Sequence, residues 1–324
     1  MSTRMHIAAG ALAALLTAAA WPGNTRAETV SISTLPPGAI NNVQAQAVAK
    51  VVQENSDMQM RVVTFNSPAA IMGAAENGQA EFAFTSNDEA GVALRGKDEH
   101  EGKPMANLRI AATIFPFSVG ILVRADSDIK TVADLEGKRF PTGWQGFKQG
   151  IPLSNAMLAT AGLSLDDMDG VPTANLLRAA DDFKAGRLDA TIFAIGAPKM
   201  AEINSAVGIR FLPLEDSPEA LARMQDVRPE YHMKVSQPSP RLPGVVGPTN
   251  LMEYYIVLLT AKDVKDETVY KAVKALYDNK AGLVAGHPSF NAMTPEGMAV
   301  EHKGLEYHPG AIRFYKEVGI WPGN

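Results

Sequence analysis

Two long β-rich runs, far apart in the sequence, restrict the fold of this chain more than any other feature. The first covers Val119 to Val123 and the second covers Tyr254 to Leu259, and a charged turn follows each of them. The block between them alternates helical and strand patterns. This arrangement predicts a chain that leaves one lobe, builds a second lobe and then returns to the first. Sequence position alone does not decide whether the two runs pair with each other.

The segment before the first long run also alternates between strand and helix patterns. Short strands are expected at Val30–Ile32 and Arg61–Val63, and apolar residues recur at helical spacing between Val43 and Val52. Ser67 followed by a proline is typical of the start of the next helix. The succession of strand, helix and strand predicts an α/β fold.

One helix-to-strand unit occurs twice. Residues Asn77 to Thr85 read NGQAEFAFT, and residues Ala185 to Phe193 read AGRLDATIF. Both place a glycine at the end of a helix and an acid three residues later, immediately before a buried strand. This similarity indicates two related lobes, although any αβ junction can look the same.

The first residues predict export. Arg4 lies in a short basic start, Ile7 to Ala20 is apolar, and Thr25-Arg26-Ala27 offers small residues at the two positions that a signal peptidase reads. The apolar run of about 14 residues is short for a permanent membrane anchor, which is the alternative. We therefore expect residues 1–27 to be a signal peptide and the mature protein to be periplasmic.

Charge and composition restrict the partners and the chemistry. Removal of Arg4 and Arg26 would change the net charge from −5 to −7, which argues against nucleic acid as a partner. The chain has no cysteine and therefore neither disulfides nor thiolate metal sites. Its histidines show no HExxH spacing, and no GxSxG motif is present. We expect no metal, no cofactor and no enzymatic activity.

Residues 140–158, FPTGWQGFKQGIPLSNAML, run from the end of an expected strand, through a loop with glycines at 143, 146 and 150, into an expected helix. This glycine-rich loop does not match a phosphate-binding loop, because Lys148 follows Phe147 instead of the last glycine. Gly143 opens the loop, and Trp144, Gln145 and Phe147 could stack on a small molecule or form hydrogen bonds with it. A surface loop with incidental aromatic residues is the alternative.

Three further loops are expected at the carboxyl ends of strands, where open α/β sheets bind ligands. They are Thr34 to Gly38, Asn66 to Pro68 and Thr85 to Asn87, and each is rich in hydroxyl, amide or glycine groups. Two of them lead into helices, whose free N–H groups and positive dipole end suit an anion. Capping of its own helix would explain Ser67 without any ligand.

The C-terminal stretch YHPGAIRFYKEVGI, residues Tyr307 to Ile320, resembles the terminal signature of the TAXI family, the TRAP-associated extracytoplasmic solute receptors. Residues Phe117 to Phe140 are similar to the hinge strand and following helix of that family. Residues Glu253 to Asn279 are similar to its return strand and helical region. The likeness covers nearly the whole mature chain. Its ligand loops depart from the family pattern, since Gly38-Ala39-Ile40 and Asn41-Asn42 replace a Gly-Gly and a tyrosine pair.

The resemblance implies a two-lobe type II periplasmic binding-protein fold with two hinge strands. Residues 28–115 plus 256–324 would form lobe I, and residues 116–255 would form lobe II. A small organic acid or amino acid would bind between the lobes and be delivered to TRAP membrane permease subunits, and capture by hinge closure needs only a monomer. The residues expected to contact the ligand are Thr34, Gly38, Asn41, Ser67, Thr85, Ser86, Asn87, Gly143, Trp144, Gln145, Phe147, Lys148 and Gly196.

Two other functions stay open at this point. A periplasmic sensor or adaptor could bind a ligand and pass the signal to a different partner. An enzyme could use the same fold, as hydroxymethylbilane synthase does, but that enzyme attaches its cofactor through a cysteine and this chain has none.

Overall fold

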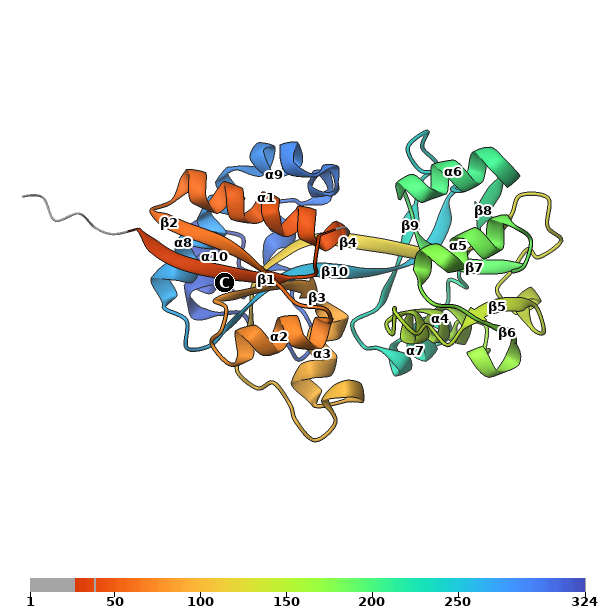
Figure 1. The fold of residues 1–324 in the computed structure, drawn as a ribbon, viewed down its shortest axis with the longest axis horizontal. Coiled ribbons are helices and arrows are strands. Elements are labelled where there is room, and N and C mark those ends of the chain that lie inside the picture. Colours follow the sequence, from red (N-terminus) through yellow and green to blue (C-terminus); the bar gives the residue numbers. More distant parts are fainter. Residues whose placement is uncertain (1–26, 38, 324) are drawn as a thin grey trace, which may run out of the picture.

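The computed structural model describes residues 27–37 and 39–323. Except for Ala27, the predicted signal peptide lies outside these residues, and so does the predicted site residue Gly38. Within the described part of the chain, no helix is both long and apolar enough to span a membrane. The described residues form two lobes, which two long strands connect (Figure 1).

The connecting strands are β4 (Leu108–Arg124) and β10 (Thr249–Ala261). They contain the two β-rich runs of the sequence, and they pair antiparallel, from Met252 opposite Val119 to Ala261 opposite Leu108. The chain therefore crosses between the lobes on two strands that support each other.

Lobe I lies on the left in Figure 1 and contains both ends of the described chain. Its parallel strands are β1 (Glu28–Thr34), β2 (Met58–Thr64) and β3 (Phe82–Ser86). Its helices are α1 (Ile40–Asn55), α2 (Pro68–Glu76), α3 (Asn87–Arg95), η1 (Asp98–His100), α8 (Asp266–Asp278), α9 (Lys280–Gly286), η4 (Pro288–Ala292), η5 (Glu296–Ala299) and α10 (Pro309–Glu317). In Figure 1, α1 and α9 lie above the sheet, and α2 and α3 lie below it.

Lobe II is built between the two crossings. Its strands are β5 (Arg139–Thr142), β6 (Asp169–Pro172), β7 (Ala190–Ala194), β8 (Ile209–Phe211) and β9 (His232–Ser236). Its helices are η2 (Ala133–Leu135), α4 (Gly150–Ala159), η3 (Leu165–Asp167), α5 (Leu176–Lys184), α6 (Pro198–Val207) and α7 (Pro218–Val227). The main sheet has the order β2-β1-β3-β10-β4-β7, with β8 on β4 and β9 on β10, while β5 and β6 form a separate parallel pair. One sheet thus continues through both lobes.

The repeated helix-to-strand unit makes the same contact in each lobe. Glu81 lies just before β3 and accepts a hydrogen bond from the backbone N–H of Ser31 in β1, at 2.6 Å. Asp189 lies just before β7 and accepts one from the backbone N–H of Arg139 in β5, at 2.9 Å. In both lobes an acid therefore attaches the start of one strand to the backbone of an earlier strand, in the middle of β1 and at the start of β5.

The crossing strands lose their register near the middle. Ile256 lies opposite Phe115 and Val257 lies opposite Thr113, so Ile114 has no counterpart, and a second shift follows within three residues. Bulges of this kind bend a strand and increase its twist. The boundary that the sequence predicts between the lobes, at residues 115 and 256, falls at the first shift.

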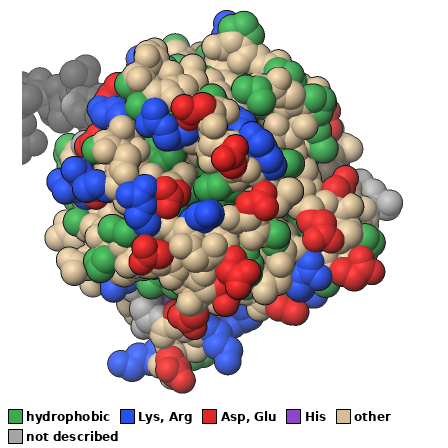
Figure 2. Space-filling view, turned by 90° about the vertical axis from the view of Figure 1, so that its right-hand side faces the viewer, with side chains coloured by type: hydrophobic (Ala, Val, Ile, Leu, Met, Phe, Trp, Pro, Cys, Tyr) green, Lys and Arg blue, Asp and Glu red, His purple; other side chains and the backbone are tan. Residues whose placement is uncertain are grey.

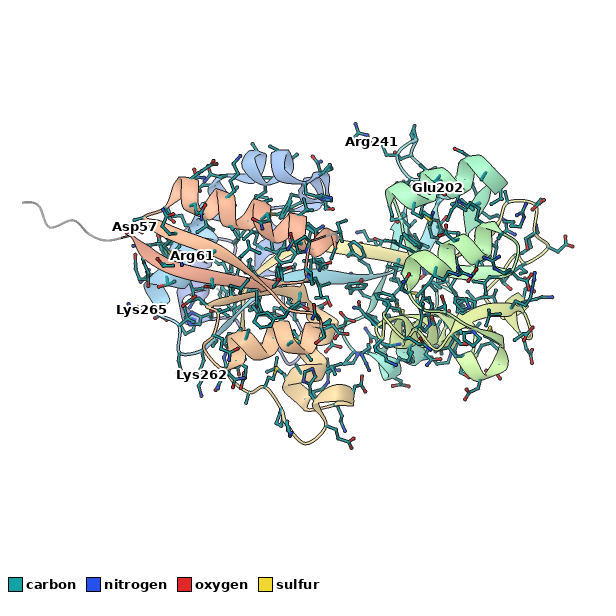
Figure 3. All side chains as sticks on the ribbon, in the orientation of Figure 1. Asp57, Arg61, Glu202, Arg241, Lys262 and Lys265 are labelled. Atoms are coloured by element: carbon teal, nitrogen blue, oxygen red, sulfur yellow. The ribbon has the colours of Figure 1, made fainter. Side chains whose placement is uncertain are left out.

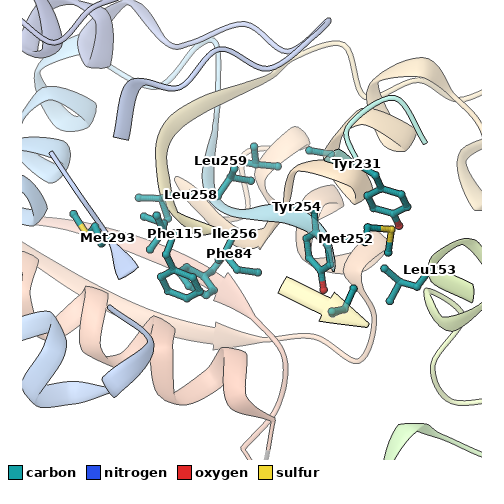
Figure 4. Packing of buried hydrophobic residues seen from close by; sticks show 14 of the residues in the cluster. Phe84, Phe115, Leu153, Tyr231, Met252, Tyr254, Ile256, Leu258, Leu259 and Met293 are labelled. Atoms are coloured by element: carbon teal, nitrogen blue, oxygen red, sulfur yellow. The ribbon is translucent and has the colours of Figure 1, made fainter. Parts of the chain in front are cut away.

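Buried apolar side chains surround the crossing strands on both sides of this irregularity (Figure 4). Toward lobe I they include Phe84, Phe115, Ile256 and Leu258, and toward lobe II they include Leu153, Tyr231, Met252 and Tyr254. The hinge region is therefore part of a continuous core.

Candidate functional site

Strand ends from both lobes face the gap between them. β1 runs from the outer end of lobe I toward lobe II, and β3 is parallel to it (Figure 1). β7 is antiparallel to β4 and ends at Ala194 opposite Val119, so its carboxyl end is directed toward lobe I. The loops after these strands therefore lie where open α/β sheets bind their ligands.

The loop after β1 contains a buried polar group without a partner. Thr34 is fully buried, and its Oγ1 has no hydrogen-bond partner among the described residues. Asn41 lies half-buried in the first turn of α1. The next residue, Asn42, donates to the backbone oxygen of Leu35 at 2.8 Å and holds the loop in place. Since most buried polar groups are hydrogen-bonded, Thr34 is a candidate ligand contact.

Ser67 caps its own helix, as the alternative interpretation expected. Its side chain accepts a hydrogen bond from the backbone N–H of Ala70 at 3.2 Å. No comparable side-chain cap is present at the start of α1, α3 or α4 among the residues that the structure describes. The first N–H groups of these three helices are thus not satisfied by a side-chain cap.

Thr85, Ser86 and Asn87 are all buried where β3 passes into α3. The Ser86 hydroxyl does not cap α3 and instead lies 3.4 Å from Nε2 of Gln149 in lobe II. Asn87 accepts a hydrogen bond from the backbone N–H of Tyr255 at 2.9 Å, and its Nδ2 lies 3.2 Å from Nδ1 of His302. Asn87 therefore attaches α3 to β10, whereas Ser86 contacts the opposite lobe.

Trp144 lies inside lobe II and not on the surface of the gap. Its side chain is fully buried, its ring meets that of Phe147 edge-on at 5.8 Å between centroids, and a Cβ at Gly150 would overlap it. Its φ of 39° is in the left-handed region, which is strained for a bulky residue. The placement differs from the stacking role expected from the sequence, because the ring supports the start of α4.

The rest of the predicted lobe II loop is more open. Gly143, Gln145 and Lys148 are exposed, and Phe147 is half-buried. The backbone N–H groups of Gln145 and Gly146 donate to the oxygens of Thr173 and Ala174, at 3.3 and 2.7 Å. Gly196, after β7, is exposed with φ 70°. These residues lie on the loops after β5 and β7, and unlike Trp144 they are not fully buried.

The structure adds a polar contact zone between the lobes that sequence reasoning missed, here called the α3 seam. It consists of Asp88, Arg95 and Asp98 of lobe I with Gln149, Arg228, Glu230 and Tyr231 of lobe II. The sequence offered only weak signals for it. Asp88 follows the predicted loop Thr85–Asn87 directly, and Gln149 lies in the glycine-rich loop.

In the α3 seam, helix α3 of lobe I is in close contact with lobe II. Glu230 forms a bidentate ion pair with Arg95, and a Cβ at Gly91 would overlap the Glu230 carboxylate. Burial raises the pKa of Glu230, although hydrogen bonding to Arg95 opposes that change. Arg228 pairs with Asp98 beside it.

A second polar network supports the other side of the crossing strands. The Thr113 hydroxyl lies 2.7 Å from Nε2 of His302 and 2.8 Å from the Tyr307 hydroxyl. Burial lowers the pKa of His302 to about 4, so this histidine is neutral at pH 7. Glu253 lies 3.0 Å from His232, and its pKa is lowered because hydrogen bonds from His232 and Ser118 outweigh burial.

A cavity of about 210 Å³ adjoins this network between β4, β9 and the segment with η4 and η5. Its lining includes Thr113, Lys234, Glu253, Tyr255 and Thr294, and none of the predicted site residues. Within residues 27–37 and 39–323, no group of three or more histidines or acids could hold a metal ion.

The geometry is that of a two-lobe α/β binding protein, with strand ends of both lobes facing a gap crossed by two strands. The model of the NMT1-like family matches residues 38–319, and the chain belongs to that family.

Solved structures show the same fold. A TctC solute-binding protein from Polaromonas, solved without ligand, is 16% identical with a TM-score of 0.55, and the match covers 85% of this chain and 90% of that one. A binding-protein component of an ABC phosphonate transporter from Pseudomonas aeruginosa is 11% identical with a TM-score of 0.51, over 82% and 80% of the two chains. A Xanthomonas citri protein bound to ATP is 11% identical with a TM-score of 0.50, over 90% and 95%. The predicted periplasmic binding-protein fold is therefore confirmed.

Proposed function

We propose that this protein is an exported, periplasmic solute receptor that captures a small carboxylate or amino-acid-like ligand between its lobes. The observation that carries the proposal is the pair of strands β4 and β10, which connect two lobes whose strand ends face each other. Such lobes close when a ligand contacts both of them at once. The strand irregularity at Ile114 gives the crossing a place to bend.

Lobe I would supply most of the hydrogen bonds to the ligand. Thr34 and Ser86 lie at the ends of neighbouring parallel strands, and the uncapped N-terminus of α1 follows the first of them. Gly38 and Asn41 follow Thr34 in the sequence, Thr85 and Asn87 flank Ser86, and Ser67 lies between β2 and α2. These residues complete the proposed lobe I site.

Lobe II would close over the ligand with Gly143, Gln145, Phe147, Lys148 and Gly196. Exposed Lys148 is the cation of this loop that could face a carboxylate. Trp144, being buried, would act by holding the loop against α4.

The partners that we propose are the membrane subunits of a TRAP transporter. The resemblance of Tyr307–Ile320 and the hinge segments to the TAXI family supports that assignment. The similar fold of the Polaromonas solute-binding protein and of the Pseudomonas transporter component supports a role in solute binding for transport. At the end of lobe II, basic and acidic side chains are interspersed (Figure 2), which does not favour a nucleic-acid surface.

The proposal is tested by native mass spectrometry of protein purified from periplasm, followed by a thermal-shift panel of amino acids, dicarboxylates and aromatic acids. We expect a co-purified small acid, or one compound that raises the melting temperature by several degrees, because a ligand of the folded state stabilises it. Absence of any bound or stabilising compound would contradict the receptor role. Ligand binding without a permease gene nearby would favour a sensor instead.

A further inference from the structure

Asp88 is a buried carboxylate between the lobes. It lies in the first turn of α3 and is fully buried. Its Oδ2 accepts hydrogen bonds from the Tyr231 hydroxyl and from Nε2 of Gln149, both at 2.9 Å. Its Oδ1 is also buried and has no partner among the described residues. One half of this carboxylate is therefore satisfied by neutral donors and the other half is not satisfied.

The charges of the α3 seam do not balance. It contains three carboxylates and two guanidinium groups, and each guanidinium is engaged by another acid. Arg95 pairs with Glu230, and Arg228 pairs with Asp98. The labelled cations Arg61, Lys262 and Lys265 lie far away on the outer part of lobe I (Figure 3).

An unpaired carboxylate is costly to bury, so structures normally give it a cation or several donors. The positive end of the α3 dipole favours a negative charge at Asp88, but it places no donor on Oδ1. The negative charge also affects its surroundings. Burial and the charge of Asp88 together raise the pKa values of Tyr231 and Tyr254. The site therefore has a buried carboxyl group with one free acceptor.

Opening of the hinge would separate this group from its neighbours in lobe II. Asp88 follows β3 and the loop Thr85–Asn87 in lobe I, whereas Gln149 belongs to the glycine-rich loop of lobe II. Separation of the lobes removes the Gln149 amide from the carboxylate. Thr34, at the end of the neighbouring strand β1, has a second buried acceptor without a partner. Gln149 and Tyr231 both bind Oδ2, so Oδ1 is the atom left for a donor on the ligand.

We propose that Asp88 binds the positively charged group of the ligand and that the receptor selects zwitterionic, amino-acid-like solutes over plain carboxylates. This inference rests on the receptor function proposed above and narrows its ligand class. The ammonium group would donate to Oδ1, and the carboxylate of the same ligand would face the uncapped helix N-termini.

The test compares matched pairs of probes that differ only in the amino group. Isothermal titration calorimetry would measure glutamate against glutarate, leucine against 4-methylpentanoate and phenylalanine against 3-phenylpropionate. We expect at least one amino acid to bind at least about 100-fold more tightly than its deaminated partner, because an unpaired buried acceptor penalises an analogue without the donor.

Asp88→Asn keeps the shape of the side chain and removes its charge. We expect it to weaken binding of the preferred amino acid at least about 30-fold while the deaminated acid changes little. Asp98→Asn is the matched control, because it removes an acid of the same seam that is already paired with Arg228. It should leave the preference for the amino acid unchanged.

A second variant keeps the test valid if Asp88→Asn does not fold. Gln149→Ala retains the Asp88 charge and removes its lobe II donor, so the preference for the amino acid should persist. Equal binding of both members of each pair, or full binding by folded Asp88→Asn, would overturn this inference and leave the receptor function in place. Failure of every probe together with an empty protein from periplasm would instead overturn the receptor function.

Discussion

Lobe I and lobe II begin with the same junction but present different side chains to the gap. In both, an acid before a strand accepts a hydrogen bond from a backbone N–H of an earlier strand, through Glu81 and Asp189. Lobe I then places small buried polar groups and the charge of Asp88 at its strand ends. Lobe II contributes neutral Gln149 and an exposed loop. Under the proposed function, lobe I would bind the positive group of the ligand, whereas lobe II would close over the ligand and bring Lys148 toward its carboxylate.

The largest expected effect is a loss of stability, and it tests whether Trp144 supports the core of lobe II or contacts the ligand. Trp144→Ala removes a fully buried ring next to Gly150, and we expect a loss of about 3–5 kcal/mol in the free energy of unfolding of the apo protein. Urea unfolding measures it. Phe147→Ala, which removes a half-buried ring from the same loop, should cost less. Unchanged apo stability with weakened ligand binding would return Trp144 to the ligand surface.

The next effect concerns the contact between the lobes. Gly91→Ala places a methyl group where the Glu230 carboxylate lies, so the ion pair with Arg95 must shift. We expect the free energy of unfolding to fall by about 2 kcal/mol, which thermal and urea unfolding would measure. Gly73→Ala in α2 is the matched control, since its Cβ would meet only Met105 at 3.8 Å. The control should be stabilised slightly, and equal behaviour of the two variants would mean that the α3 seam contributes little.

The smallest effect tests the shared junction. Asp189→Asn and Glu81→Gln each remove a charged acceptor of a backbone N–H. We expect each substitution to lower the free energy of unfolding by about 1 kcal/mol at pH 7. A hydrogen bond from Arg139 lowers the pKa of Asp189 below its ordinary 3.8. Its stabilisation is therefore complete above that value and is lost as the pH falls through the lowered pKa.

Urea unfolding at several pH values between 7 and about 3 would follow this change. The difference between wild type and Asp189→Asn should shrink toward the acid end of that range. If only one of Asp189→Asn and Glu81→Gln clearly lost stability, the two junctions would be alike in geometry but would contribute unequally to stability.

Local sequence patterns predicted much of the fold. Helical spacing located α1, the serine before proline located the start of α2, and the repeated glycine and acid located the starts of β3 and β7. The sequence also predicted that the loops beginning at Thr34, Asn66 and Thr85 follow strands. These features depend on residues a few positions apart, which a single sequence displays directly.

Tertiary structure decided the features that depend on distant residues. The pairing of β4 with β10 joins segments more than 130 positions apart. The burial of Trp144 and the contact of Asp88 with Tyr231, 143 residues away, had no local signal. An aromatic residue in a loop suits either a surface or a core, and an acid at a helix start suits either solvent or a ligand. Capping, spacing and composition determined the elements, whereas packing between the lobes determined which side chains are enclosed, because burial depends on what lies opposite.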